Sequence, residues 1–276
     1  MLLIILVFTC YYAWQAVPLE RKNMFMKNFY FAITLLAMLI VGCAPKEQGV
    51  HIEASNIKVT ANEKSDGVEN VRAILERNKA YVDSIKSPVL GEAAVALDKY
   101  VPESPLMNFA ADALFEMAQR YSKEKIDIAI TNKGGLRSNI AAGTITFGDV
   151  YNVFTFENTL AMLTLNGEQL WQLCSEIAAV GGEAIAGMRL VITEDGKLVD
   201  VTVGGEPLND LTKEYRVATS DYLSQGNDKM TALALGTERH VTKLVIRDLM
   251  VEYIKEHAAA GKKITAECDG RITIKE

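Results

Sequence analysis

The residues around position 130 constrain the fold most, because a short strand pattern runs directly into a pair of glycines. Residues 126–130, Ile-Asp-Ile-Ala-Ile, are β-branched and alternate as a half-buried strand does. Gly134 and Gly135 follow, and adjacent glycines let the backbone adopt positive φ or pass close to a ligand. Asn132 and Arg137 flank them with an amide and a guanidinium that suit a polar small molecule. From the residues alone, this segment is either a ligand-binding loop or a tight left-handed turn beside an exposed Arg. It does not match the phosphate-cradling spacing G-x-x-x-x-G-K-[ST].

Composition narrows the class of protein. The chain has 276 residues, of which 49% are hydrophobic, enough for one well-buried domain. Its formal net charge of −6 argues against a nucleic-acid polymer as partner. Beyond the N-terminal region only Cys174 and Cys268 remain, without a redox motif, and we expect both to be buried thiols.

The N-terminal region has the pattern of an export signal. Residues 28–42 form an apolar run behind Met26 and Lys27, and they end in Ile-Val-Gly before Cys43, which resembles a bacterial lipobox. We therefore expect residues 1–42 to be a leader and Cys43 to carry lipid; the alternatives are a plain membrane anchor and an ordinary buried Cys. This places the protein in the bacterial cell envelope, lipid-anchored and periplasmic or surface-facing.

Two stretches beside this signal need separate interpretations. Residues 1–25 contain a second apolar run, which we attribute to a mis-assigned start codon rather than to a transmembrane segment. Residues 43–66 are polar and predict a lipidated tether, with a strand over residues 51–60.

Hydrophobic periodicity divides the rest of the chain into a linker helix, residues 67–86, and a domain, residues 87–276. Mixed helices and strands without regular alternation predict an α+β fold, in which mixed β-sheets pack with helices in layers. The predicted helices are residues 68–84, 105–121, 168–180 and 241–259. The predicted strands are residues 126–130, 143–151 with a turn, 160–165, 188–193, 198–203 and 215–219. Asn108 and Asp112 lie one turn apart on the second helix, where they either brace the ligand loop or form a structural clamp; the clamp is favoured.

Several motifs in fixed order resemble the C-terminal domain of the bimetallic 5'-nucleotidase family, which includes UDP-sugar hydrolases and 2',3'-cyclic-nucleotide phosphodiesterases. The resemblance covers roughly residues 88–274. It is carried by residues 103–114 (ESPLMNFAADAL), 131–159 (TNKGGLRSNIAAGTITFGDVYNVFTFENT), 220–228 (SDYLSQGND) and 270–272 (GRI). It implies the layered α+β fold of that domain and a role in binding nucleotide substrates.

The resemblance also implies roles for individual residues. Asn132, Gly134, Gly135 and Arg137 match the loop that contacts the nucleoside and phosphate side of the substrate. Phe156 and Tyr222 match the two aromatics that stack on the base, and Asp228 matches the acidic residue that holds the ribose hydroxyls. The family's Gly-Gly-Asp-Gly becomes Gly-Asn-Asp-Lys here, so Asn227 is expected to tolerate a left-handed backbone and Lys229 to reshape the pocket or pair with Asp228.

The family hydrolyses phosphate esters with two metal ions that a separate N-terminal domain binds. The three histidines here, His51, His240 and His257, form no ligand motif, so we expect no metal, no cofactor and no catalytic residue in this chain. The resemblance then implies the nucleotide-recognition half of a hydrolase in nucleotide catabolism, working with a separately encoded metallophosphatase chain that binds divalent metals. The alternatives are a non-catalytic nucleoside- or nucleotide-binding surface lipoprotein and a degenerate domain with a structural role.

Overall fold

The computed structural model describes residues 66–275, with side chains from residue 69, and these residues belong to one compact unit, Lys64–Glu276. The leader, Cys43, the tether with its predicted strand and His51 lie outside the described residues. The helices are α3 (Asp66–Lys86), α4 (Pro105–Tyr121), α5 (Phe147–Val153), α6 (Gly167–Ala179), α7 (Asp221–Ser224), α8 (Thr231–Ala234) and α9 (Ile246–Ala259), with short 3₁₀ turns η1 (Lys133–Gly135) and η2 (Asn227–Lys229). None of the described helices is both long enough and apolar enough to span a bilayer.

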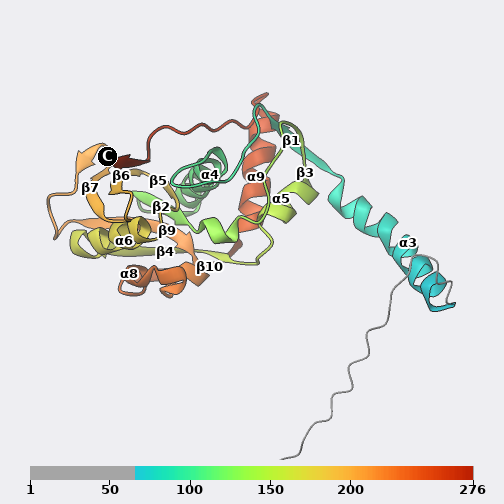
Figure 1. Ribbon diagram of the computed structural model, residues 1–276, viewed down its shortest axis with the longest axis horizontal. Coiled ribbons are helices and arrows are strands. Elements are labelled where there is room, and N and C mark those ends of the chain that lie inside the picture. The colour runs from blue at the N-terminus through green and yellow to red at the C-terminus, as the bar shows by residue number, and fades with distance from the viewer. Residues whose placement is uncertain (1–65, 276) are drawn as a thin grey trace, which may run out of the picture. The chain divides into compact units, whose positions relative to one another are not determined.

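The described strands form three sheets (Figure 1). A five-stranded mixed sheet has the order β10-β4-β9-β2-β5, a four-stranded sheet has the order β11-β6-β7-β8, and β1 pairs with β3. The bounds are β1 (Val89–Ala93), β2 (Ile128–Thr131), β3 (Gly143–Thr146), β4 (Thr159–Asn166), β5 (Ala184–Ala186), β6 (Met188–Thr193), β7 (Leu198–Val203), β8 (Glu206–Pro207), β9 (Glu214–Ser220), β10 (Thr237–Val245) and β11 (Ile272–Lys275).

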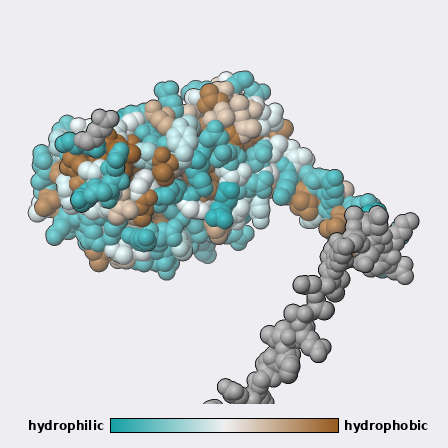
Figure 2. All heavy atoms as spheres, viewed as in Figure 1, coloured by the Kyte–Doolittle hydropathy of each residue, from teal (hydrophilic) through white to brown (hydrophobic). Residues whose placement is uncertain are grey.

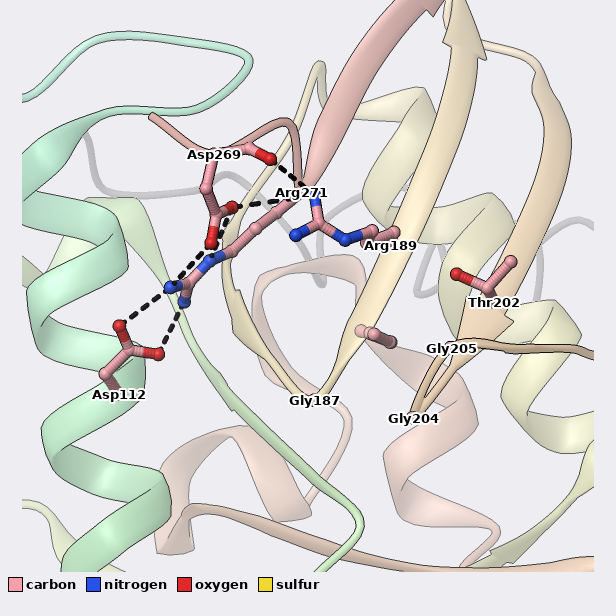
Figure 3. A pocket seen from close by; sticks show the side chains of 9 residues that line it. Asp112, Gly187, Arg189, Thr202, Gly204, Gly205, Asp269 and Arg271 are labelled. Atoms are coloured by element: carbon pink, nitrogen blue, oxygen red, sulfur yellow. Dashed lines mark hydrogen bonds and ion pairs between the residues drawn. The ribbon is translucent and has the colours of Figure 1, made fainter. Parts of the chain in front are cut away.

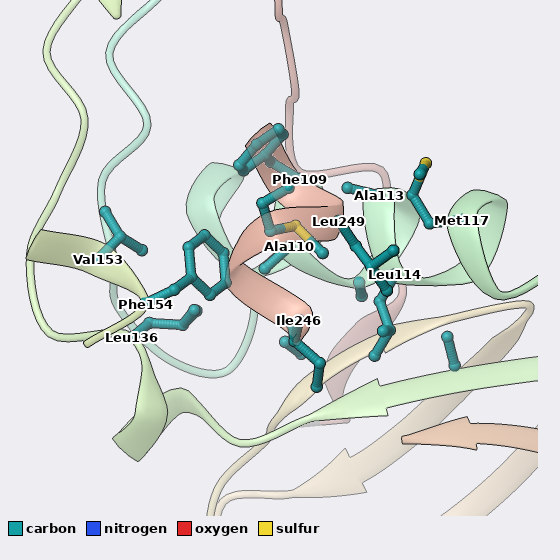
Figure 4. Packing of buried hydrophobic residues seen from close by; sticks show 14 of the residues in the cluster. Phe109, Ala110, Ala113, Leu114, Met117, Leu136, Val153, Phe154, Ile246 and Leu249 are labelled. Carbon is teal, nitrogen blue, oxygen red and sulfur yellow. The ribbon is translucent and has the colours of Figure 1, made fainter. Parts of the chain in front are cut away.

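The five-stranded sheet separates two hydrophobic cores, because successive side chains of a strand point to opposite faces. Ala129 of β2 packs with α4 and α9 in the first core, whereas Ile128 and Ile130 face the second core. Figure 4 shows part of the first core, where Phe109 and Leu114 of α4 meet Ile246 and Leu249 of α9. The second core contains α6 and the four-stranded sheet. The protein is thus built of mixed sheets packed with helices, as the sequence predicted.

Local capping explains several element boundaries. Ser104 caps α4, with Pro105 as its first residue, and Asn166 forms a capping box with Gln169 at the start of α6. Both helices were predicted within a residue of their observed start.

Two predictions about elements and one about a cysteine were wrong. Residues 241–245, predicted as the start of the last helix, belong to strand β10, and the helix begins at Ile246. Residues 147–151, predicted as part of a strand and turn, belong to α5, which Thr146 caps in a capping box with Asp149. Cys174 is a buried free thiol as expected, but Cys268 is exposed.

Candidate functional site

Neighbouring strand ends bring three distant segments together at one edge of the five-stranded sheet. β2 and β9 run parallel, so the glycine loop after Thr131 and the segment after Ser220 leave the sheet on the same side. β4 is antiparallel to β9, and Leu160 at its start pairs with Ser220 at the end of β9. The residues just before β4 therefore meet the other two segments. Clefts outside the carboxyl ends of parallel strands are common ligand sites.

A cavity of about 370 Å³ lies between these three segments. It contains every binding residue that the sequence predicted, together with one that it did not, Asn158. The lining residues are Asn132, Gly134, Gly135, Arg137, Phe156, Asn158, Tyr222 and Asp228.

The glycines let the loop backbone approach a side chain closely. Residues 133–135 form the 3₁₀ turn η1, and neither Gly134 nor Gly135 has a positive φ. The alternative prediction for this segment, a tight left-handed turn, is therefore wrong. A Cβ at Gly135 would lie 2.8 Å from the Asn132 Oδ1, closer than real Cβ atoms come. The absence of a side chain at Gly135 thus leaves room for the Asn132 amide, which is almost fully buried.

Lys133 and Glu183 fasten this loop to the end of α6. The Lys133 backbone N–H donates to the Glu183 carboxylate. The Lys133 ammonium donates to the carbonyls of Val180 and Gly182 at 2.8 and 2.6 Å and lies 3.4 Å from Glu183 Oε1. Burial raises the pKa of Glu183, and the Lys133 contacts only partly oppose that effect. The pair positions the loop from behind the cavity.

Asp228 is the centre of the polar network in the cavity. Its Oδ2 accepts a hydrogen bond from the Asn132 amide at 2.5 Å, and its Oδ1 accepts one from the Tyr222 hydroxyl at 2.9 Å. The bond to the Asp228 carboxylate raises the pKa of Tyr222. A carboxylate has about four lone-pair positions, so Asp228 keeps capacity for two further donors.

The backbone around Asp228 is held in an uncommon conformation. Gly226, Asp228 and Lys229 have φ of 86°, 54° and 67°, in the left-handed region that costs non-glycine residues free energy. The left-handed conformation falls on Asp228 and Lys229, and not on Asn227, whose side chain donates to the Tyr222 carbonyl at 2.8 Å. Of the two roles considered for Lys229, an ion pair with Asp228 is not formed among the described residues, and Lys229 does not line the cavity that it was expected to reshape.

The remaining lining side chains are available to a ligand. Phe156 and Tyr222 are 52% and 40% exposed, so both rings present surface to the cavity. Arg137 is exposed, and its guanidinium donates only to the Gly134 carbonyl at 3.3 Å, without an ion-pair partner in residues 66–275. An aromatic surface, a carboxylate and a free guanidinium therefore meet in one cavity.

Asn108 and Asp112 belong to a different structure. Asn108 donates to Glu103 and to the Glu267 carbonyl at 2.6 and 2.8 Å, and Asp112 forms a bidentate ion pair with Arg271 at 2.6 and 2.7 Å. Figure 3 shows this ion pair beside a second cavity, of about 250 Å³. These contacts hold α4 against the C-terminal segment. The predicted structural clamp is therefore confirmed, and the alternative, that Asn108 and Asp112 brace the ligand loop, is wrong.

The described residues do not supply a metal site. Within residues 66–275 no three His, Cys, Asp or Glu side chains converge as metal ligands. His240 lies in strand β10, and His257 lies in α9 with its Nδ1 near the Tyr253 carbonyl.

Comparison with known proteins agrees with this geometry. A profile of the family described as 5'-nucleotidase, C-terminal domain matches residues 85–235, more than half of the chain. The chain belongs to this family. It is 29% identical over 253 residues to the trifunctional nucleotide phosphoesterase protein YfkN of Bacillus subtilis, covering 84% of this chain and 17% of that protein. It is 30% identical over 214 residues to the endonuclease YhcR of the same organism, covering 74% of this chain and 17% of that protein.

A solved structure of the same family shows the same fold. The 5'-nucleotidase precursor of Thermus thermophilus superposes with a TM-score of 0.62 at 29% identity, covering 75% of this chain and 42% of that one. The chain thus spans less than half the length of each of these three relatives. It matches a part of each of them.

Two residues of the site were missed by sequence reasoning. Asn158 follows Phe156 by two positions, and only the antiparallel pairing of β4 with β9 shows that it faces the cavity. Glu183 carried no signal, because a single carboxylate after two glycines is typical of a solvated turn; its 6% exposure is visible only in the fold.

Proposed function

We propose that this chain is the nucleotide-recognition half of a 5'-nucleotidase-type phosphoesterase in nucleotide catabolism. The observation that carries the proposal is the cavity itself, in which Phe156, Tyr222, Asp228 and Arg137 converge from three separate segments. Membership of the 5'-nucleotidase C-terminal domain family supports the same substrate class.

Each part of a nucleotide has a complementary group in the cavity. The exposed rings of Phe156 and Tyr222 offer flat surface for a base, and one such stacked contact is worth about 1–3 kcal/mol. Asp228 accepts hydrogen bonds from sugar hydroxyls with its free lone pairs, while Asn132 and Tyr222 keep its carboxylate oriented. Arg137 pairs with a phosphate through its unpaired guanidinium.

Hydrolysis requires groups that residues 66–275 do not provide. Because no metal-ligand cluster lies among them, a two-metal displacement does not fit this part of the chain. We propose that a separately encoded metallophosphatase chain supplies the metals and the reactive water.

Calorimetric titration of the full chain tests recognition. We expect AMP to bind more tightly than adenosine, because only AMP carries a phosphate for Arg137, and inorganic phosphate alone to bind more weakly than either. Arg137→Ala and Phe156→Ala are expected to weaken AMP binding without unfolding the domain. Unchanged AMP affinity in both variants would overturn the assignment of the cavity.

A second function is a nucleotide-capture protein without hydrolysis. The specific observation in its favour is that the cavity holds a complete set of binding groups while the described residues hold no metal-ligand cluster. It differs from the first proposal in one respect: addition of a metallophosphatase chain would leave the bound nucleotide intact.

We also propose that the protein is held at the bacterial cell envelope through lipid on Cys43. The apolar run of residues 28–42 before the Ile-Val-Gly-Cys sequence supports this. Growth with a labelled fatty acid should label the protein, and Cys43→Ala should abolish the label and release the protein from membranes. Equal labelling of Cys43→Ala would refute the anchor.

A further inference from the structure

Helix α3 presents an apolar surface that the described residues leave uncovered. All described side chains from position 69 to position 85 are exposed, although α3 is 21 residues long. Figure 2 shows hydrophobic residues among hydrophilic ones along this helix. The large hydrophobic side chains, each between 42% and 68% exposed, are Val71, Ile74, Leu75, Tyr81, Val82 and Ile85. A helix of this length gains most of its stability from covering such a surface.

These residues follow a heptad repeat. Val71, Asn78 and Ile85 are spaced by seven and occupy the a position, and Ile74 and Tyr81 occupy the d position. Leu75 and Val82 follow at the e position and widen the apolar stripe. Two helices with apolar a and d positions pack along this stripe as a coiled coil.

We propose that α3 is a dimerisation helix, which forms a parallel, in-register, two-stranded coiled coil with α3 of a second copy of this chain. Asn78 indicates that the partner that covers the apolar stripe is a second copy of the same helix. It lies in the middle of the apolar stripe, where its amide nitrogen donates to the Ile74 carbonyl at 2.8 Å and its side-chain oxygen has no partner among residues 66–275. In an in-register pair the two Asn78 side chains meet, and a single Asn at an a position specifies a parallel dimer.

The charges of α3 fit a second copy of the helix as the binding partner, and they do not fit an anionic membrane surface. Acidic side chains at positions 69, 76 and 83 each precede a basic one by three residues, at positions 72, 79 and 86, so opposite charges alternate along the outer face of one helix. In the proposed register Arg77 lies opposite Val82 of the second copy, so no like charges face each other. A helix that binds an anionic membrane surface is instead rich in Lys and Arg.

Site-directed cross-linking in the full chain tests both the partner and the register. Val71→Cys and Ile85→Cys place a thiol on the proposed seam, and Ala80→Cys places the matched control on the opposite face. All variants also carry Cys10→Ser, Cys43→Ser and Cys268→Ser, because Cys268 is exposed and Cys10 and Cys43 lie outside the described residues. We expect Val71→Cys and Ile85→Cys each to form covalent dimers by itself, and Ala80→Cys to form several-fold fewer. A cross-link that forms only when Val71→Cys and Ile85→Cys are mixed means antiparallel helices and overturns the proposal, as do equal yields at positions 71 and 80.

The mass in solution gives an independent test. Light scattering of the full chain should give twice the chain mass, Ile74→Glu should reduce it to the monomer, and Ala73→Glu on the outer face should leave the dimer intact. A monomeric wild-type chain, or a dimer that persists in Ile74→Glu, would overturn the proposal. Nucleotide titration of Ile74→Glu shows whether the cavity still binds, which separates this result from a failure of the proposed function.

Discussion

Replacement of Phe156 by Ala tests the aromatic surface of the cavity. The side chain is 52% exposed, so its removal deletes little packing, and we expect the free energy of unfolding to change by less than about 1 kcal/mol. Loss of one base-stacking contact costs about 1–3 kcal/mol of binding free energy. With tenfold in affinity for every 1.4 kcal/mol, AMP binding should weaken by about 5- to 140-fold.

The assay is calorimetric titration of AMP into the full chain, with urea unfolding of the same preparations. Trp171→Ala is the matched control, because Trp171 is an aromatic residue of α6 that is 39% exposed and does not line the cavity. We expect Trp171→Ala to leave AMP affinity unchanged. Equal AMP affinities of Phe156→Ala and the wild type, with both proteins folded, would refute the stacking role.

Other groups make separate contributions. Arg137→Ala should reduce AMP affinity about tenfold or more and change adenosine affinity little, because a charge-assisted hydrogen bond worth about 1.5–3 kcal/mol is lost only with the phosphate; parallel titrations measure the difference. Asp228→Asn should weaken adenosine more than 2',3'-dideoxyadenosine, because only adenosine offers both ribose hydroxyls, and equal losses would contradict the sugar contact. Asp112→Ala removes a partly exposed ion pair with Arg271, so we expect urea unfolding to show a loss of about 1–2 kcal/mol in the free energy of unfolding. Calorimetry should show unchanged AMP affinity. Because burial raises the pKa of Glu183 above 4.5, the folded state holds that proton more tightly than the unfolded state. Stability should therefore fall as pH rises from 4.5 through the raised pKa, and Glu183→Gln should remove this slope from urea unfolding curves measured across that range.

The sequence predicted the composition of the cavity better than its geometry. The glycine loop, Phe156, Tyr222 and Asp228 were all placed by motif, and the structure gathers them in one cavity. The network between Asn132, Tyr222 and Asp228 could not be predicted, because these contacts cross up to 96 positions and depend on the adjacency of β2 and β9. The left-handed backbone at Lys229 was equally hidden, since lysine carries no signal for that conformation.

Errors in the elements have separate physical causes. Strand β10 is at an edge of the five-stranded sheet and most of its residues are exposed, so it lacks the alternation that identifies a half-buried strand. Helix α5 did carry a signal, because Thr146 and Asp149 have the capping-box spacing, but its seven residues are too few to show helical periodicity. Helix α3, in contrast, was predicted from its hydrophobic periodicity, and the apolar stripe that shows this periodicity remains uncovered among the described residues.

Phosphate release from AMP shows whether this chain acts as the recognition half of a two-chain phosphoesterase. The full chain is assayed with Mn²⁺, alone and together with a metallophosphatase chain from the same organism, and the metallophosphatase is also assayed by itself. We expect release only when both chains are present, and loss of that release in Phe156→Ala. Release by this chain alone, or no release from the pair while AMP still binds, would contradict this expectation.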